Sequence, residues 1–138
     1  MRTARSVVAI LAIGVIGAGA TSCAADEPPT APIGVRVGLA SYYARSLDGK
    51  RTASGVPFDN GALVAAHPTY PFGTVVRVTN LRNDRSVDVR IVDRGPTRAV
   101  RTKGVIIDLS RAAADALGFL EDGRTRVRLE VVRLGTTG

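Results

Sequence analysis

The sequence is poor in the residue types on which many functional sites depend. Its 138 residues include one cysteine, one histidine, one methionine and no tryptophan. A single cysteine cannot form a disulfide within the chain, and one histidine cannot build the clusters that hold zinc. The sequence also has no glycine-rich phosphate loop and no nucleophile-elbow motif. We therefore expect neither a metal ion nor an organic cofactor.

The longest uncharged apolar stretch lies near the N-terminus, at residues 7–20. It is shorter than the about 20 residues that a helix needs to cross a bilayer. Arg2 and Arg5 precede it and give this end a positive charge. A positive segment followed by a short apolar one is typical of a cleaved secretory signal. Residues 1–22 are therefore predicted to be a signal peptide.

The only cysteine, Cys23, directly follows this segment. The residues Ala20-Thr21-Ser22 before it resemble a lipobox, in which the cysteine becomes acylated and N-terminal. Ordinary cleavage after Ala20 is the alternative, and it would leave Cys23 as a free thiol in an oxidising compartment. We favour acylation because it removes that thiol. Several acyl chains would then hold the protein stably on a membrane of the cell envelope, whereas an unacylated product would be secreted.

The residues after Cys23 differ in composition from those that follow. Residues 23–34 are rich in proline and show no apolar periodicity, so they are expected to form a flexible linker. The formal net charge is +7, and loss of Arg2 and Arg5 would lower it to +5. A basic exported domain suits acidic polymers of the cell wall. Export and the scattered arginines argue against a nucleic-acid partner.

Residues 35–138 carry the pattern of one β-rich domain, which we expect to be monomeric. Residues 126–131 alternate strictly between apolar and charged side chains, as a half-buried strand does. Further strands are predicted at 74–79, 86–92 and 105–109, and a short helix at 111–117 between Ser110 and Gly118. Short strands with frequent turns and one short helix indicate a small closed or nearly closed barrel.

One carboxylate stands out against this strand pattern. Alternation over residues 87–93 predicts that Asp93 follows three apolar residues on the core side, at the end of the strand. Arg94-Gly95-Pro96 then breaks the strand, so Asp93 is expected at the mouth of the barrel. Partial burial there would favour a protonated carboxyl that can donate a proton. The simpler interpretation, that Asp93 caps the turn or pairs with an arginine, is favoured by the spacing alone.

Other polar and aromatic residues have weaker signals. His67 is able to hydrogen-bond a carboxylate or a sugar hydroxyl, but a lone histidine beside a proline is more often structural. Asp59 is interpreted first as a turn residue and second as a ligand. Asp108 is interpreted as structural. Tyr42 and Tyr43 offer flat faces on which sugar rings stack, although tyrosines in a strand are commonly part of the packing.

Ordered motifs along the domain resemble the rare lipoprotein A family and its double-psi β-barrel. The motifs are Gly38-Leu39-Ala40-Ser41-Tyr42-Tyr43, Thr52-Ala53-Ser54-Gly55, Phe58-Asp59, Ala65-Ala66-His67-Pro68, Pro71-Phe72-Gly73-Thr74, Val76-Arg77-Val78-Thr79-Asn80, Val89-Arg90-Ile91-Val92-Asp93-Arg94-Gly95-Pro96 and Ile107-Asp108-Leu109-Ser110. The resemblance covers about residues 37–134. It implies a mainly β fold, a small six-stranded double-psi β-barrel with one or two short helices.

The resemblance also implies an activity, which we take as an expectation. It is that of a lytic transglycosylase that cuts peptidoglycan glycan strands, preferably strands without stem peptides. Asp93 would protonate the glycosidic oxygen and, as a carboxylate, help close a 1,6-anhydro ring. His67 would orient Asp93 or the sugar, and Tyr42, Tyr43, Asp59 and Arg94 would bind the substrate.

This chain departs from the family at one acidic position. The family usually has a glutamate after Thr-Ala-Ser-Gly, and this chain has Val56. Val56 favours a second interpretation, that of a non-catalytic, expansin-like module that binds cell-wall glycans. The presence of Asp93 and His67 favours the enzyme, which we take as the leading hypothesis. A purely structural envelope lipoprotein would give Asp93 and His67 no shared purpose.

Overall fold

The computed structural model describes residues 34–136. The predicted signal peptide, Cys23 and the linker as far as residue 33 lie outside the described residues. Within residues 34–136, no helix is long and apolar enough to cross a membrane.

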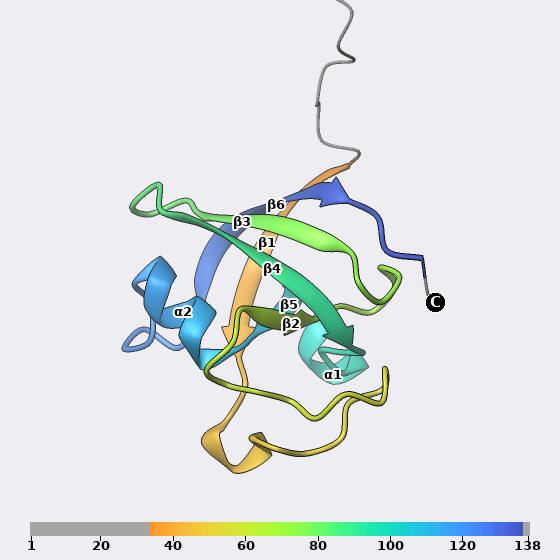
Figure 1. The fold of residues 1–138 in the computed structure, drawn as a ribbon. Helices are drawn as coiled ribbons and strands as arrows, with labels where there is room; N and C mark the ends of the chain where they lie inside the picture. The colour runs from red at the N-terminus through yellow and green to blue at the C-terminus, as the bar shows by residue number, and fades with distance from the viewer. Residues whose placement is uncertain (1–33, 137–138) are drawn as a thin grey trace, which may run out of the picture.

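Six strands close into a barrel with the order β1-β5-β2-β4-β3-β6, in which β6 pairs with β1 (Figure 1). The β1/β5 and β2/β4 pairs are parallel, and the remaining neighbours are antiparallel. The strands are β1 (Val35–Tyr42), β2 (Val64–Ala66), β3 (Val75–Asn80), β4 (Ser86–Asp93), β5 (Val105–Leu109) and β6 (Thr125–Arg133). The predicted mainly β, six-stranded barrel is therefore confirmed.

Three short helical segments complete the fold of residues 34–136. They are α1 (Arg98–Arg101), α2 (Arg111–Leu117) and a 3-10 turn (Arg45–Leu47). The α2 helix has the predicted bounds because its ends carry the expected signals. Ser110 Oγ accepts a hydrogen bond from the Ala113 N–H at 3.2 Å, and Gly118 takes the left-handed conformation with φ 78°.

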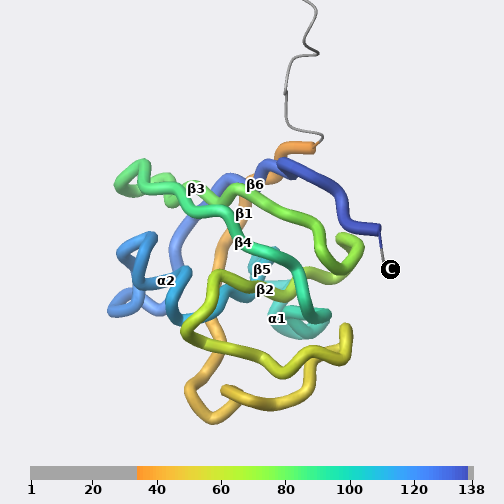
Figure 2. The backbone as a smooth tube through the Cα atoms, in the orientation of Figure 1, coloured from red at the N-terminus to blue at the C-terminus, as the bar shows by residue number. Residues whose placement is uncertain are grey.

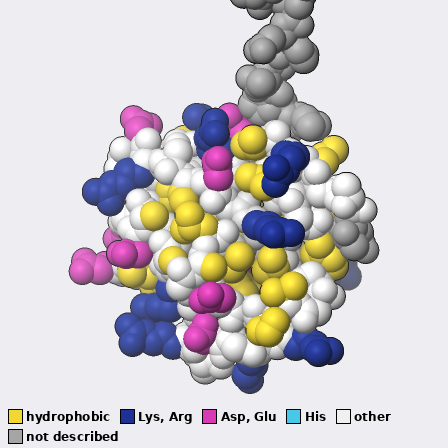
Figure 3. Space-filling model, viewed as in Figure 1, with side chains coloured by type: hydrophobic (Ala, Val, Ile, Leu, Met, Phe, Trp, Pro, Cys, Tyr) yellow, Lys and Arg dark blue, Asp and Glu magenta, His cyan; other side chains and the backbone are white. Residues whose placement is uncertain are grey.

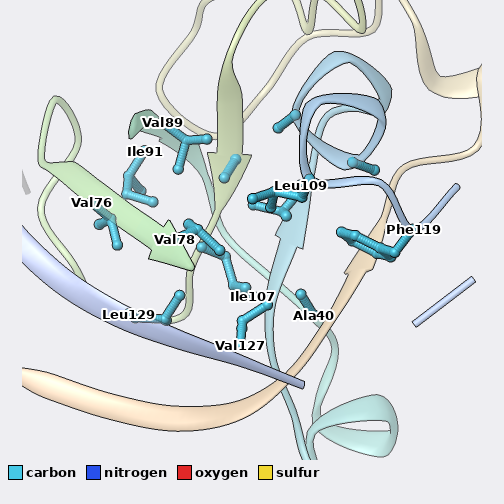
Figure 4. Close-up of a cluster of buried hydrophobic side chains, with 14 residues drawn as sticks. Ala40, Val76, Val78, Val89, Ile91, Ile107, Leu109, Phe119, Val127 and Leu129 are labelled. Atoms are coloured by element: carbon cyan, nitrogen blue, oxygen red, sulfur yellow. The ribbon is translucent and has the colours of Figure 1, made fainter. Parts of the chain in front are cut away.

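The core fills the inside of the barrel. In β6, Val127, Leu129 and Val131 are buried, while alternate residues are not, as the sequence pattern predicts. Figure 4 shows Val127 and Leu129 beside Ile107 from β5 and Val78 from β3. The buried side chains of α2 and Phe119 extend this cluster beyond the strands. Strand β2 is only three residues long and was not predicted from the sequence.

Asn80 organises the turn between β3 and β4. Its side chain is 2% exposed, yet each polar atom has a partner. Oδ1 accepts from the Arg82 N–H at 3.0 Å and from the Thr125 hydroxyl at 2.9 Å, and Nδ2 donates to the Leu117 carbonyl at 2.8 Å. The turn, β6 and the end of α2 are thereby tied together, as expected of a buried amide that costs free energy when unpaired.

The long connection between β1 and β2 crosses one end of the barrel. Residues 43–63 run from the end of β1 past the end of β4 (Figures 1 and 2), where the Ser54 N–H donates to the Val92 carbonyl. Part of this connection is a small hairpin, in which Arg51 pairs with Pro57. The hairpin is held by the Thr52 hydroxyl, which donates to the Val56 carbonyl at 2.6 Å. We call residues 51–57 the rim hairpin.

Candidate active site

Asp93 is the last residue of β4, at the end of the barrel where the rim hairpin lies, as predicted. Its side chain, however, is not on the face of β4 that points into the core. Ala65 lies opposite Ile91, whereas the next residue, Ala66, lies opposite Asp93. The pairing between β2 and β4 therefore shifts by one residue, so that Val92 has no directly opposite partner on β2. Because directly paired residues share one face of a sheet, Asp93 shares the face of Ala66 instead of that of Ile91. Strict alternation predicted the core side for Asp93, and this irregularity corrects that prediction.

Three donors hold the Asp93 carboxylate. Oδ1 accepts from the main-chain N–H groups of Ala53, at 2.9 Å, and Arg94, at 2.8 Å. Oδ2 accepts from the Tyr43 hydroxyl at 2.7 Å. Hydrogen bonds to a carboxylate stabilise its charged form. The contact with Ala53 comes from the rim hairpin, so the Thr52-Ala53-Ser54-Gly55 motif serves to fix this carboxylate.

Tyr43 is placed to remain a donor. Its ring stacks on Phe58 with centroids 3.9 Å apart and planes 12° apart. Burial raises the pKa of Tyr43, and the hydrogen bond to Asp93 and the charge of Asp93 raise it further. The phenol therefore keeps its proton throughout the physiological range. Phe58 covers one face of Tyr43, which leaves that face unavailable to a sugar.

Asp108 brings a second carboxyl group to the same place. Ala66 lies opposite Asp93 on β4 and also opposite Asp108 on β5, and Asp108 lies opposite Ser41 on β1. The row Ser41–Asp108–Ala66–Asp93 thus crosses four adjacent strands on one face. With strands about 4.8 Å apart, the two aspartate backbones are separated by the width of one alanine-bearing strand.

The environment of Asp108 differs from that of Asp93. Burial raises the pKa of the Asp108 carboxyl and the charge of Asp93 raises it further, while the Ser41 hydrogen bond and Arg124 oppose this rise. The Ser41 hydroxyl donates to Oδ1 of Asp108. Among the described residues, no hydrogen bond to Oδ2 of Asp108 is formed. The sequence reasoning missed this residue because its signal is a pairing between distant strands.

Both carboxyl groups line one cleft. Its volume is about 390 Å³. Tyr42 and Tyr43 contribute from the end of β1, Lys50 and Arg51 add positive charge, and the remaining wall consists of Ala44, Leu47, Phe58, Asp93, Arg94, Gly95, Pro96, Thr97 and Asp108. Tyr42 donates its hydroxyl to the Leu120 carbonyl at 2.5 Å and packs edge-on against Phe119. A cleft with cationic and aromatic walls around two carboxyl groups fits a polar, ring-shaped substrate.

The His67 side chain forms hydrogen bonds and a ring stack within its own loop. Its Nδ1 accepts from the N–H groups of Thr69 and Tyr70, each at 3.1 Å, and its ring stacks on Tyr70 at 3.6 Å. Burial and the positive charges of Arg36 and Arg94 lower the pKa of His67 to about 4. The imidazole is therefore neutral, with its proton on Nε2. The His67 main-chain N–H donates to the Asp93 carbonyl at 3.1 Å, which links this loop to the end of β4.

The side chains of Arg94 and Asp59, both predicted to bind substrate, also form hydrogen bonds within the protein. The Arg94 guanidinium donates to the carbonyls of Tyr70, at 2.8 Å, and His67, at 3.3 Å, and lies 3.9 Å from the centre of the Phe72 ring. Arg94 still lines the cleft. Asp59 caps a turn by accepting from the Gly61 N–H at 2.8 Å and does not line the Asp93 cleft. Its substrate-binding role therefore stays a prediction.

Position 56 also faces away from the cleft of Asp93. Val56 is 53% exposed and lines two neighbouring hollows. It contributes to the Asp93 site through its carbonyl, which accepts from Thr52 within the rim hairpin. Within the described part of the chain, no three His, Cys, Asp or Glu residues cluster as metal ligands would.

Several bacterial proteins are similar in sequence to this domain. The chain is 50% identical to "Probable endolytic peptidoglycan transglycosylase RlpA" of Synechocystis over 99 residues, covering 72% of this chain and 30% of that protein. It is 48% identical to "Endolytic peptidoglycan transglycosylase RlpA" of Pasteurella multocida over 103 residues, 75% of this chain and 34% of that protein. The chain thus spans about a third of the length of these relatives.

Solved structures share the fold. The Streptomyces papain inhibitor matches with a TM-score of 0.59 and 27% identity, over 74% of this chain and 97% of its own. An expansin of Clavibacter michiganensis matches with a TM-score of 0.55 and 22% identity, over 74% of this chain and 52% of its own. With the strand order described above, these matches confirm the double-psi β-barrel.

The family assignment follows from a match that covers most of the barrel. The lytic transglycolase family matches residues 35–129, from the first residue of β1 into β6. The motifs that carry the resemblance to rare lipoprotein A fall within this range, and the relatives bear that name. This chain belongs to the lytic transglycolase family.

Proposed function

We propose that this domain is an endolytic lytic transglycosylase of peptidoglycan. It would cleave the bond between N-acetylmuramic acid and N-acetylglucosamine in peptide-stripped strands and leave a 1,6-anhydro end. One observation carries the proposal: Asp93 and Asp108 share a cleft in unlike environments, one with three hydrogen-bond donors and one whose pKa is raised by burial. Unequal carboxyl groups in one cleft are the usual basis of acid–base chemistry on glycosides.

The two groups divide the chemistry. Asp108, protonated, donates its proton to the glycosidic oxygen as the bond from C1 of the muramic acid breaks. Asp93 stabilises the positive charge that develops at C1 and accepts the proton of the C6 hydroxyl as that oxygen bonds to C1. No water is consumed, and solvent returns the proton from Asp93 to Asp108 for the next cycle. The family resemblance, by contrast, implies that Asp93 performs both steps.

The surrounding residues fix these groups. Tyr43 and the rim hairpin hold Asp93, and Ser41 holds Asp108. His67 supports the end of β4 through its main chain, and Tyr42 and Arg94 would contact the sugar from the cleft wall. A preorganised pair of carboxyl groups lowers the barrier because little has to move during the reaction.

Incubation with intact and with amidase-stripped peptidoglycan tests the proposal. We expect 1,6-anhydro products, detected by mass spectrometry, from stripped strands, and a roughly 10²- to 10⁴-fold lower rate for Asp93→Asn. Asp88→Asn, an exposed acid on the same strand, is the matched control and should retain the activity. Hydrolytic products, or equal rates for wild type and Asp93→Asn, would refute the mechanism.

A glycan-binding module without activity is the second candidate. Val56, in place of the usual family glutamate, favours it. Retention of the protein on peptidoglycan without any anhydro product would establish the binding module and remove the enzyme. The Val56→Glu variant distinguishes the binding module from the enzyme further. If its rate of anhydro-product formation rises from an undetectable level, the carboxyl group missing at position 56 is what the activity requires.

We also propose that the protein is exported and anchored in the cell envelope. The support is the predicted signal peptide 1–22, the lipobox-like run before Cys23 and the cell-wall substrate named for the relatives. Residues 23–34 would tether the domain of residues 35–138 to the membrane. Intact-mass measurement of the membrane fraction should show acyl chains on Cys23. A soluble product cleaved upstream of Cys23 would contradict the anchor.

A further inference from the structure

A second hollow lies beside the catalytic cleft. Its volume is about 560 Å³, and two of its residues are arginines, Arg90 of β4 and Arg133 of β6. Both arginines are exposed, and both lie opposite Val75 in the register of the barrel. They therefore extend from the same face of the sheet as Val75, from the two strands that flank β3. We call this space the arginine hollow.

The arginine hollow has unbalanced positive charge. Its other lining residues are Ser54, Val56, Val64, Phe72, Gly73, Ile91, Val92, Leu134, Gly135 and Thr136, none of which is acidic. The ion pairs formed among residues 34–136 are Arg77–Asp88, Arg82–Asp122 and Arg128–Glu130. Within that part of the chain, no carboxylate neutralises Arg90 or Arg133. Figure 3 shows basic side chains among hydrophobic ones on the face that β3 and β4 present.

Part of the lining of the arginine hollow is apolar. Phe72, Val64 and Leu134 contribute carbon surface. Gly135 has no room for a side chain, because a Cβ there would lie 2.1 Å from the Phe72 carbonyl oxygen. The terminal nitrogen Nη2 of Arg90 lies above Gly73, 3.9 Å from the position of a Cβ. Apolar surface beside guanidinium groups suits a sugar ring that carries an acidic substituent.

Neighbouring residues line the arginine hollow on one side and the cleft on the other. Phe72 of the hollow stacks on Arg94 of the cleft at 3.9 Å. In the rim hairpin, Ala53 donates to Asp93 while the next residue, Ser54, lines the hollow. A polymer that places one sugar at Asp93 would therefore pass the arginine hollow with a neighbouring sugar.

We infer that the arginine hollow is an anion subsite that binds the free lactyl carboxylate of a muramic acid residue in a peptide-stripped strand. The inference rests on the proposed function, because it takes the same polymer as substrate. In a strand that still bears stem peptides, this carboxyl is consumed in an amide bond and offers no charge to Arg90 or Arg133. Planar guanidinium groups bind carboxylates with charge-assisted, often bidentate hydrogen bonds. The subsite would thus select stripped strands by charge.

Binding of the full-length protein to three polymers tests the subsite, in an Asp93→Asn background that leaves the polymer uncut. The polymers are peptide-stripped peptidoglycan, the same material with its carboxylates converted to neutral amides, and intact peptidoglycan. We expect the stripped strands to bind at least about tenfold more tightly than either of the others. Arg90→Gln with Arg133→Gln should abolish that preference. Arg85→Gln with Arg126→Gln removes the same charge outside the hollow and should leave the preference intact.

The outcomes separate this inference from the proposed function. Equal binding of stripped and amidated strands, or an equal loss in both double variants, would overturn the subsite even if anhydro products form. Equal, arginine-dependent binding of intact and stripped polymer would overturn the lactyl assignment, because it would point to carboxylates of peptides or to wall phosphates. An arginine-dependent preference in this binding test, together with no anhydro products from the wild-type protein, would support the subsite and refute the enzyme.

Discussion

Two polar clusters of this barrel contrast in how their hydrogen-bonding capacity is used. Asn80 is buried, and the turn, β6 and α2 supply partners for both its oxygen and its nitrogen. Asp93 and Asp108 also have partners, but they face a cleft of about 390 Å³. The first cluster is satisfied inside the fold, whereas the second has charge and lone pairs left for a ligand.

The contrast shows how one small fold separates stability from chemistry. A buried amide with every bond made stabilises the packing, because leaving any of these groups unpaired would cost free energy. In the cleft, burial and the negative charge of Asp93 raise the pKa of the Asp108 carboxyl, so this group holds a proton more readily than an exposed one. Substitutions at Asn80 should therefore act on folding, and substitutions at the carboxyl groups on activity.

The largest expected effect is on activity, at Asp108. Asp108→Asn keeps the size of the side chain and removes the proton donor, so we expect the rate of anhydro-product formation to fall about 100-fold or more. In the wild type, the rate should decline as the pH rises and the Asp108 carboxyl loses its proton. Thermal unfolding should change little. Asp115→Asn, an exposed acid on α2, serves as the control; a normal rate in Asp108→Asn would remove it from the mechanism.

Asn80 should show the reverse behaviour. Asn80→Ala leaves the Thr125 hydroxyl and the Arg82 N–H without their partner, so we expect a loss of about 2–3 kcal/mol in the free energy of unfolding. Urea unfolding measures this change, and the activity of the molecules that remain folded should be normal. Asn83→Ala, on the exposed side of the same turn, should cost less. A lower activity of the folded Asn80→Ala molecules would contradict the claim that Asn80 acts on folding alone.

His67 should make stability depend on pH. Its pKa is about 4 in the folded protein and near 6.5 when unfolded, so the unfolded state binds the extra proton first. Keeping His67 neutral contributes about 1–3 kcal/mol to the free energy of unfolding. This contribution is complete above pH ~6.5 and is lost as the pH falls towards 4. Urea midpoints at pH 7 and pH 4.5 should differ less in His67→Gln. An identical pH dependence in both proteins would contradict the buried, neutral state.

The smallest expected effect is at Tyr43. Tyr43→Phe retains the stacking on Phe58 and removes one of the three donors to Asp93, which is worth about 0.5–1.5 kcal/mol. We expect kcat to fall roughly three- to tenfold with KM nearly unchanged. Tyr70→Phe is the control, because Tyr70 stacks on His67 outside the cleft. A rise in KM alone would mean that Tyr43 binds sugar instead of positioning Asp93.

The sequence predicted the fold well wherever the pattern is local. Strict alternation located β6, and Ser110 and Gly118 bounded α2, because caps and half-buried strands act through neighbouring residues. Strand β2 escaped detection because three residues are too few to show a period. Its importance lies in its neighbours, since it joins β4 to β5.

The site was predictable only in part. Asp93 was found because a carboxylate at the end of an apolar strand, before a glycine and a proline, is locally unusual. The contacts of Tyr43 and His67 were not predicted, because the Tyr43 hydroxyl reaches Asp93 across 50 residues of chain and the His67 ring is bonded within the loop 67–70. Such contacts depend on the path of the chain between β1 and β2, which no local pattern encodes.

The sequence by itself determined the positions of most strands and the placement of Asp93 at the end of β4, since each depends on residues close together in the chain. Only the tertiary structure decided that Asp108 joins Asp93. The reason is the register of β5 and β4 on either side of Ala66, with the shift past Val92 that turns Asp93 out of the core. Strand register is fixed by the packing of the whole barrel, so a cleft lined by residues of β1, β4 and β5 exists only after the barrel has closed.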